Sequence, residues 1–341
     1  MNHPTNAKET RMPTFLLRAL IALQAFAGLL IVLLAGPALA QAWPTARPIT
    51  LVVAYAPGGG ADAVARLITV ELGKKLGQSI VIDNRPGAGG NIGTASVARA
   101  APDGYTLLLT PPGPIINSKL LYKSLPYDPE RDLAPVMKLV ESPFAVLVRP
   151  DFPAKNLTEL IAYARAHPGK LNVGTVGVGS TGHLLNLMVE HHTKTQFNIV
   201  PYKGSGQVVT DLLAGRLDMT IDYPSTYFGH IAQNKVRPIG TLGTTRSELL
   251  PGVQTFAEAG TPEIEATGWF GLVAPRGTPD AVVQRLQQEI AEILRMPEVR
   301  DKLLPLGYTP AATTPEQLRQ LAASEMARIG AIVRSANLSL E

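Results

Sequence analysis

The sequence predicts an α/β fold with largely parallel sheets, divided into two domains. From Trp43 onward, short runs typical of β-strands alternate with amphipathic helical runs, a pattern that indicates parallel strands joined by crossover helices. Two stretches, Ile49–Asp62 and Leu171–His183, share one local plan: a short apolar strand, a Gly-rich turn and the start of a helix. Roughly 300 residues follow the N-terminal segment, which is more than one ordinary hydrophobic core holds, so two domains are expected.

Eight short runs rich in β-branched and apolar residues predict strands, and four amphipathic runs predict helices. The strands are expected at Ile49–Ala54, Ser79–Ile82, Tyr105–Leu109, Phe144–Val148, Leu171–Val173, Asn198–Val200, Leu217–Ile221 and Trp269–Val273. The helices are expected at Ala61–Leu76, Leu157–Ala166, Gly182–Thr193 and Gln207–Ala214. Asn156 with Glu159 has the spacing of a helix N-cap, and so has Thr314 with Gln317. After Pro279 the chain is predicted to be mostly helical.

The N-terminal segment has the layout of a secretory signal peptide. Three basic residues within the first 18 precede an uncharged stretch from Ala19 to Ala46, and Ala-x-Ala sequences end at Ala40 and Ala42. Residues 1–42 are therefore predicted to be a signal peptide, cleaved after Ala40 or Ala42, and the mature chain to be periplasmic. The alternative is an uncleaved anchor helix, because the apolar run is long for a signal. The chain contains no cysteine, so neither a disulfide framework nor a lipidated cysteine is expected.

The charge of the mature chain excludes a nucleic-acid surface. Residues 1–42 contain three basic residues and one acidic residue, so the totals of 31 Lys plus Arg and 27 Asp plus Glu fall to 28 and 26 without them. A net charge of +2 with no basic block does not match the clustered Lys and Arg that bind nucleic acid.

The first Gly-rich turn is predicted to bind a carboxylate or phosphate. The first N–H groups of a helix have no partner within the helix, the helix dipole adds positive charge there, and glycines allow close approach to the backbone. Asp62 has a competing interpretation as an N-cap or first-turn residue, which general capping preferences favour. The candidate ligand-binding residues of this turn are Tyr55, Ala56, Gly58, Gly59, Gly60 and Asp62.

The second Gly-rich turn is predicted to face the same cleft, because ligands of open α/β sheets bind beyond the carboxyl ends of the strands. Its candidates are Thr175, Gly179, Ser180, Thr181 and His183. The helix N-terminus should lower the pKa of His183, which would then donate a hydrogen bond as a neutral ring. Three further candidates follow short strands of the second half, although charged residues at loop ends are usually only solvated. They are Lys203, Gly204 and Asp222.

Other motifs in these turns indicate different functions. Gly58–Ala63 fits the dinucleotide pattern G-x-G-x-x-A and Asp83 ends the next strand, but a secretory leader argues against a nicotinamide enzyme. Ser180 with His183 could indicate nucleophilic catalysis. The nucleophile elbow G-x-S-x-G needs a glycine at position 178, however, and this chain has Val178. No set of residues has metal-ligand spacing, so no catalytic residue, metal or cofactor is predicted.

The mature sequence resembles the substrate-binding proteins of tripartite tricarboxylate transporters, also called the Bug family. The resemblance extends from Trp43 to Val333 and rests on several segments in the same order and spacing. They read ARPITLVVAYAPGGGADAVARL, VIDNRPGAGGNIGT, APDGYTLLL, LPYDPERDLAPV, GVGSTGHL, VPYKGSGQVVTDLLAGRLDM and WFGLVAPRGTP. Two departures are Pro111–Pro114, where many members carry small polar residues, and Pro238, within a segment that is usually a plain strand.

This resemblance implies a two-lobed type II periplasmic binding protein with two doubly wound, mostly parallel sheets and a ligand cleft between the lobes. The lobes are expected at residues 43–143 plus 265–341 and at residues 144–264. The family relationship also implies a small carboxylate ligand, held by the loops at Tyr55–Asp62 and Thr175–His183, and two integral-membrane transporter subunits as partners. The receptor is expected to be a monomer without catalytic activity.

Two rival functions stay open at the level of sequence. The same fold could serve as a ligand sensor for a signalling partner, which the neighbouring genes would reveal. An extracytoplasmic hydrolase is the second rival, and it would need a nucleophile with a base in reach or a metal, which the sequence lacks. Dicarboxylates, tricarboxylates, aromatic carboxylates and acidic amino acids are all compatible with an anion site built from backbone groups.

Overall fold

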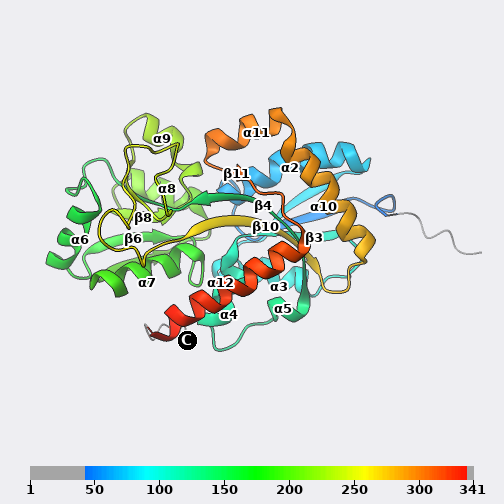
Figure 1. Ribbon diagram of the computed structural model, residues 1–341, viewed down its shortest axis with the longest axis horizontal. Helices are drawn as coiled ribbons and strands as arrows, with labels where there is room; N and C mark the ends of the chain where they lie inside the picture. Colours follow the sequence, from blue (N-terminus) through cyan, green and yellow to red (C-terminus); the bar gives the residue numbers. More distant parts are fainter. Residues whose placement is uncertain (1–42, 336–341) are drawn as a thin grey trace, which may run out of the picture. The chain divides into compact units, whose positions relative to one another are not determined.

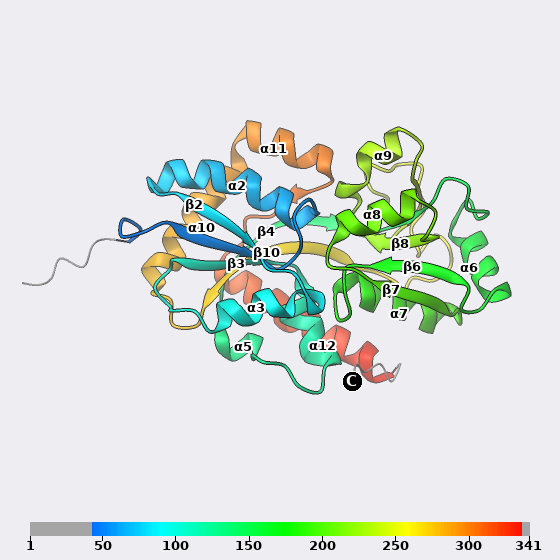
Figure 2. The same cartoon turned by 180° about the vertical axis from the view of Figure 1, so that it is seen from behind.

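Two β-sheets organise the chain, and helices cover both faces of each sheet (Figures 1 and 2). The computed structural model describes residues 43–335, so the predicted signal peptide over residues 1–42 lies outside the described residues. Each sheet together with its helices is called a lobe below. The first lobe contains strands β1 to β4, β10 and β11, and the second lobe contains β5 to β9. The α/β prediction is confirmed.

The first sheet has the strand order β11-β4-β10-β3-β1-β2. Strand β1 pairs in parallel with β2 and β3, whereas β10 is antiparallel to both β3 and β4, and β11 is antiparallel to β4. The strands are β1 (Ile49–Val53), β2 (Ile80–Asn84), β3 (Thr106–Thr110), β4 (Leu133–Pro143), β10 (Thr267–Pro275) and β11 (Thr309–Pro310).

The second sheet has the strand order β7-β6-β8-β5-β9. Strand β6 pairs in parallel with β7 and β8, and β5 is antiparallel to β8 and β9. The strands are β5 (Ala145–Val148), β6 (Leu171–Thr175), β7 (Phe197–Pro201), β8 (Met219–Asp222) and β9 (Arg237–Thr241). One direction dominates each sheet, as predicted, but β5, β10 and β11 run against it. Strands β4, β9 and β11 lie outside the predicted set.

Helices pack on both sides of the sheets because each presents an apolar stripe to the core. In the first lobe α2 and α10 cover one face, and α3 and α12 the other (Figure 1). The helices are α2 (Gly60–Leu76), α3 (Asn91–Ala98), α4 (Ser118–Leu121), α5 (Pro129–Asp132), α6 (Leu157–Ala166), α7 (Thr181–Thr193), α8 (Ser205–Leu213), α9 (Phe228–Ala232), α10 (Asp280–Arg295), α11 (Pro297–Leu303) and α12 (Pro315–Ser335). The short turns are η1 (Ala88–Gly90), η2 (Gly113–Asn117), η3 (Pro224–Thr226) and η4 (Leu304–Leu306).

The two predicted helix caps are present. The side-chain oxygen of Asn156 accepts from the backbone N–H of Glu159 at 2.9 Å, ahead of α6. Ahead of α12, the Thr314 hydroxyl accepts from the N–H of Gln317 at 3.1 Å, and the Gln317 side chain accepts from the N–H of Thr314 at 2.8 Å. This reciprocal pair is a capping box, so both helix starts are fixed by local sequence.

The chain passes between the lobes next to β4 and β10. Strand β4 ends at Pro143 in the first lobe and β5 begins at Ala145 in the second, while the chain between β9 and β10 returns it to the first sheet. The exact lobe boundaries, residues 43–143 with 265–341 and residues 144–264, stay a prediction. Within residues 43–335 no helix has the length and apolar character needed to cross a lipid bilayer.

Candidate functional site

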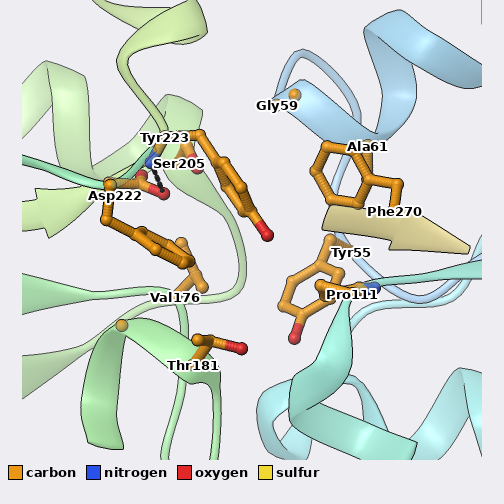
Figure 3. A pocket seen from close by; sticks show the side chains of 13 residues that line it. Tyr55, Gly59, Ala61, Pro111, Val176, Thr181, Ser205, Asp222, Tyr223 and Phe270 are labelled. Atoms are coloured by element: carbon orange, nitrogen blue, oxygen red, sulfur yellow. Dashed lines mark hydrogen bonds between the residues drawn. The ribbon is translucent and has the colours of Figure 1, made fainter. Parts of the chain in front are cut away.

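A pocket lies where the two lobes meet, and residues from both lobes line it (Figure 3). The unfilled space is about 440 Å³, a figure that includes open solvent at the mouth. The lining residues are Tyr55, Gly59, Gly60, Ala61, Pro111, Phe144, Val176, Thr181, Gly182, Ser205, Asp222, Tyr223 and Phe270.

The first Gly-rich turn reaches the pocket through its second and third glycines. Gly59 is the N-cap of α2, with an extended backbone and no side-chain cap, and Gly60 begins the helix. A Cβ on Gly60 would lie 2.0 Å from the Tyr308 hydroxyl oxygen, so only glycine fits there. Tyr308 in turn shares a hydrogen bond of 2.6 Å with Ser225 of the second lobe. The amino end of α2 is therefore open to the pocket and is held against the opposite lobe.

Asp62 shapes this turn and is not among the residues that line the pocket. Its carboxylate accepts from the N–H of Gly58 at 3.1 Å, from the Asn84 amide at 3.2 Å and from Arg66 at 2.8 Å. Burial alone would raise the pKa of Asp62, but Arg66, the Gly58 amide and Asn84 together hold it below 3.8. This agrees with the first-turn interpretation, in which the side chain reaches back to fix the glycines.

Thr181 of the second Gly-rich turn lines the pocket, whereas the other polar groups of this turn form hydrogen bonds within the turn. Ser180 is fully buried as the N-cap of α7 and accepts from the N–H of His183 at 3.2 Å. Its hydroxyl lies 3.2 Å from that of Thr175, and Nδ1 of His183 accepts from the N–H of Gly179 at 3.3 Å. Burial lowers the pKa of His183 and so favours the neutral ring, and the bond that Nδ1 accepts from Gly179 assigns the ring proton to Nε2.

The loop before α8 joins the lobes through the backbone. The N–H of Ala56 donates to the carbonyl of Lys203 at 3.2 Å, and a Cβ on Gly204 would lie 2.9 Å from the Ala56 side chain. The Lys203 side chain is exposed and is not among the pocket-lining residues. Ser205 begins α8 and does line the pocket. Three helices, α2, α7 and α8, therefore begin at the pocket.

Asp222 ends β8 and is 4% exposed in the pocket wall. Its carboxylate accepts from the N–H of Tyr223 at 2.8 Å and from the Tyr227 hydroxyl at 3.0 Å. Burial raises the pKa of Asp222 even though Ser205, the Tyr223 amide and Tyr227 favour the ionised form. Asp222 is thus a buried acid whose neighbours are neutral donors.

Five of the predicted site residues line the pocket, and nine lie around it. Tyr55, Gly59, Gly60, Thr181 and Asp222 are in the lining. Gly58 and Asp62 build the first turn, Thr175, Gly179, Ser180 and His183 build the second, and Ala56, Lys203 and Gly204 form the contact between the lobes.

The largely apolar wall of the pocket is absent from the sequence-based candidates. Pro111 follows β3, Val176 follows β6 and Tyr223 follows β8, so the rule that ligands bind beyond strand ends would have found these three. Phe144 joins β4 to β5 and Phe270 lies within β10, and no local signal marks either of them.

The lobes contact each other directly around this pocket. The Tyr122 hydroxyl of the first lobe donates to the carbonyl of Val178 at 3.0 Å, and the Tyr223 hydroxyl of the second lobe donates to the carbonyl of Trp269 at 3.3 Å. Among the described residues, no group of three or more His, Cys, Asp or Glu is placed to hold a metal ion. The Ser180 hydroxyl accepts from the backbone N–H of His183 and lies next to the Thr175 hydroxyl, which is the arrangement of a helix cap.

Comparison with known proteins identifies relatives over most of the chain. The family model described as the tripartite tricarboxylate transporter family receptor matches residues 64–338. A Pseudomonas sp. (strain P51) protein, the UPF0065 protein in the tcbD-tcbE intergenic region, is 39% identical over 289 residues, covering 84% of this chain and 85% of that protein. Protein BugT of Bordetella pertussis is 37% identical over 309 residues, covering 90% and 94%.

Solved structures share the fold. Rpa4515 of R. palustris with adipate is 36% identical with a TM-score of 0.83, covering 87% of this chain and 99% of that one. MatC of Rhodopseudomonas palustris with bound malate is 36% identical with a TM-score of 0.82, covering 85% and 99%. The periplasmic binding protein BugD is 31% identical with a TM-score of 0.83, covering 87% and 99%. The chain therefore has the two-lobed fold of periplasmic binding proteins and belongs to the tripartite tricarboxylate transporter receptor family, whose members are substrate-binding receptors and not enzymes.

Proposed function

We propose that this chain is a periplasmic receptor that binds a small carboxylate between its lobes and delivers it to a tripartite tricarboxylate-type membrane transporter. The observation that carries the proposal is the meeting of three helix N-termini, those of α2, α7 and α8, at one pocket. Each N-terminus offers unpaired N–H groups and about half a positive charge, which together suit an anion. Relatives 36% identical to this chain are described with adipate and with malate, both carboxylates.

The proposed site residues divide into those that touch the ligand and those that position the others. The backbone N–H groups of Gly59, Gly60 and Thr181 would donate to the carboxylate. The groups around Asp62 and His183 would hold these donors in place. Closure of the lobes would remove water from the anion and so strengthen each hydrogen bond to it.

The direct test is a panel of acids measured on the purified mature protein. Dicarboxylates, tricarboxylates, aromatic carboxylates and amino acids would be screened by thermal shift and the positives measured by calorimetry. A ligand that binds only the folded protein stabilises it by about 2.7 kcal/mol at a hundredfold excess over Kd. Recovery of the acid unchanged after incubation is expected. Consumption of the acid, or no binding by any carboxylate, would refute the proposed function.

The proposed location and partners have separate tests. If residues 1–42 are a signal peptide, the intact mass of the exported protein should begin after Ala40 or Ala42. A full-length protein in the membrane fraction would support the anchor instead. Sedimentation should show a monomer, and crosslinking in membranes should join the liganded protein to two integral-membrane subunits. Crosslinking to a sensor kinase would favour the signalling role.

A further inference from the structure

Asp222 is the only charged side chain among the thirteen residues that line the pocket in the described part of the chain. Its oxygens accept hydrogen bonds from the Ser205 hydroxyl, the Tyr223 amide and the Tyr227 hydroxyl. These donors are neutral, and no ion pair joins Asp222 to a described lysine, arginine or histidine side chain. A carboxylate needs a cation or a proton to be stable when it is buried to this degree.

The lining also supplies aromatic rings. Tyr55, Phe144, Tyr223 and Phe270 contribute four rings to the pocket lining. In Figure 3 the rings of Tyr223 and Tyr55 enter the pocket from opposite sides, and Phe270 lies on the same side as Tyr55. The face of an aromatic ring attracts an ammonium group, especially one removed from water. A buried carboxylate and several rings without a cation of their own are the elements of an ammonium site.

The charge balance of the pocket also favours a ligand with a positively charged group. Three helix N-termini supply about half a positive charge each, and an ionised Asp222 offsets most of that sum. A ligand with two or three carboxylates would then meet too little positive charge, because no lysine, arginine or histidine lines the pocket. A ligand with one extra positive group would leave the pocket close to neutral.

We propose that the pocket selects a carboxylate that also carries a positively charged nitrogen, as an amino acid or a betaine does. The carboxylate would lie at the N-termini of α2 and α7, and the ammonium would pair with Asp222 between the rings. This inference rests on the proposed function and chooses among the carboxylates that it allows. Asp222 then acts as the specificity-determining residue of the site.

Matched pairs of acids that differ in the charged nitrogen test this inference on the wild-type protein. Suitable pairs are aspartate with succinate, glutamate with glutarate, phenylalanine with 3-phenylpropanoate, and glycine betaine with 3,3-dimethylbutanoate, in which a carbon atom replaces the charged nitrogen. In the pair whose size fits, the nitrogen-bearing acid should bind roughly ten- to a hundredfold more tightly, as expected for a charge-assisted contact. Preference for aspartate, glutamate or phenylalanine would indicate an amino acid, and preference for glycine betaine a quaternary nitrogen.

The variant Asp222→Asn tests the residue itself. Its affinity for the preferred acid should fall by a similar factor, and its affinity for the nitrogen-free partner should rise. Asp301→Asn, which removes a carboxylate from the exposed surface of α11, is the matched control and should change neither value. If the nitrogen-free acids bind equally or more tightly in the wild type, the inference is overturned while the proposed function stands. If no acid binds, both fail together.

Discussion

Gly59 and Gly179 occupy similar places in the two turns but differ in what a side chain would meet. Gly59 has φ −88°, which any residue adopts, and the nearest atom to an added Cβ is the Ser205 hydroxyl at 3.8 Å. Gly179 has φ +80°, and a Cβ there would lie 2.6 Å from the Tyr122 ring. A substitution at Gly179 therefore strains the fold, whereas one at Gly59 extends into the pocket.

We expect Gly59→Val to lose ligand affinity by at least about tenfold, equivalent to roughly 1.4 kcal/mol, with little change in unliganded Tm. The valine methyl groups would occupy the space in which an anion approaches the N–H groups of α2. Calorimetric Kd and Tm of the same preparation check this expectation. Normal affinity in a folded Gly59→Val protein would remove the first turn from the site.

Asp62 gives a prediction with a defined pH dependence. Its folded-state pKa is lowered, so the stabilisation it provides is fully present above the unfolded value near 3.8 and is lost as the pH falls through the folded value. Asp62→Asn should therefore unfold at lower urea concentration than the wild type at pH 7. The gap between the two proteins should narrow below pH 3.8, and a gap that does not depend on pH would contradict the assigned contacts.

At the scale of elements, α12 is fixed to β10 by a partly buried acid. Glu325 of α12 accepts from the indole N–H of Trp269 at 3.1 Å. Burial raises the pKa of Glu325, and the Trp269 hydrogen bond and the charges of Arg328 and Lys138 only partly oppose this. Since Trp269 also accepts the Tyr223 hydroxyl of the second lobe, α12 is connected to the pocket wall through β10.

A raised folded-state pKa means that the native protein holds the Glu325 proton more tightly than the unfolded chain. Stability from this group is present below the unfolded value near 4.5 and falls as the pH rises through the folded value. Glu325→Gln keeps an acceptor for Trp269 and cannot ionise. It should match the wild type near pH 4 and exceed it in unfolding free energy at pH 8, as measured by urea titration. A variant less stable at pH 8 would show that the charge itself stabilises α12.

The sequence predicted the elements whose pattern is local and missed those that depend on distant neighbours. Strands such as β1 and β6 are short apolar runs before glycines, and their predicted and observed starts coincide at Ile49 and Leu171. Strand β9 contains Pro238, which is tolerated because β9 is an edge strand, and β11 has only two residues. The reversed direction of β5 and β10 follows from the way the chain changes lobes, which no local pattern records.

The same distinction applies to the site. Both Gly-rich turns could be predicted because a strand, glycines and a helix start are contiguous in sequence. The sequence could not show that Ser180 and His183 bond to their own turn while Thr181 faces the pocket. Phe144 and Phe270 were missed because they are 126 positions apart in the sequence and line one pocket only in the folded protein.

At the scale of the whole molecule, the lobes approach closely where Gly89 and Gly177 meet. A Cβ on Gly89 of the first lobe would lie 2.2 Å from the carbonyl oxygen of Val178, and one on Gly177 would lie 2.8 Å from the N–H of Gly89. Neither position leaves room for a methyl group. The observed contact between the lobes therefore requires glycine at both positions.

Gly89→Ala and Gly77→Ala form a matched pair for testing this contact. Both glycines have left-handed backbones, with φ +63° and +62°, so alanine strains each by a similar amount. An added Cβ on Gly77 meets nothing within 4 Å. Gly89→Ala should lose more stability than Gly77→Ala because its Cβ also meets the Val178 carbonyl, and only Gly89→Ala should weaken carboxylate binding and enlarge the radius of gyration of the liganded protein. Equal affinities would show that the glycine contact is not needed for binding.

The three helix starts at the pocket have an evolutionary consequence. Hydrogen bonds from main-chain N–H groups do not depend on which side chains surround them, provided that the turns keep their glycines. Relatives could therefore exchange residues such as Val176, Asp222 and Phe270 and acquire new ligands without losing the capacity to hold an anion. The main-chain donors would then be inherited while the lining side chains diverge. One fold could therefore give rise to many receptors through a few substitutions at the ends of its strands.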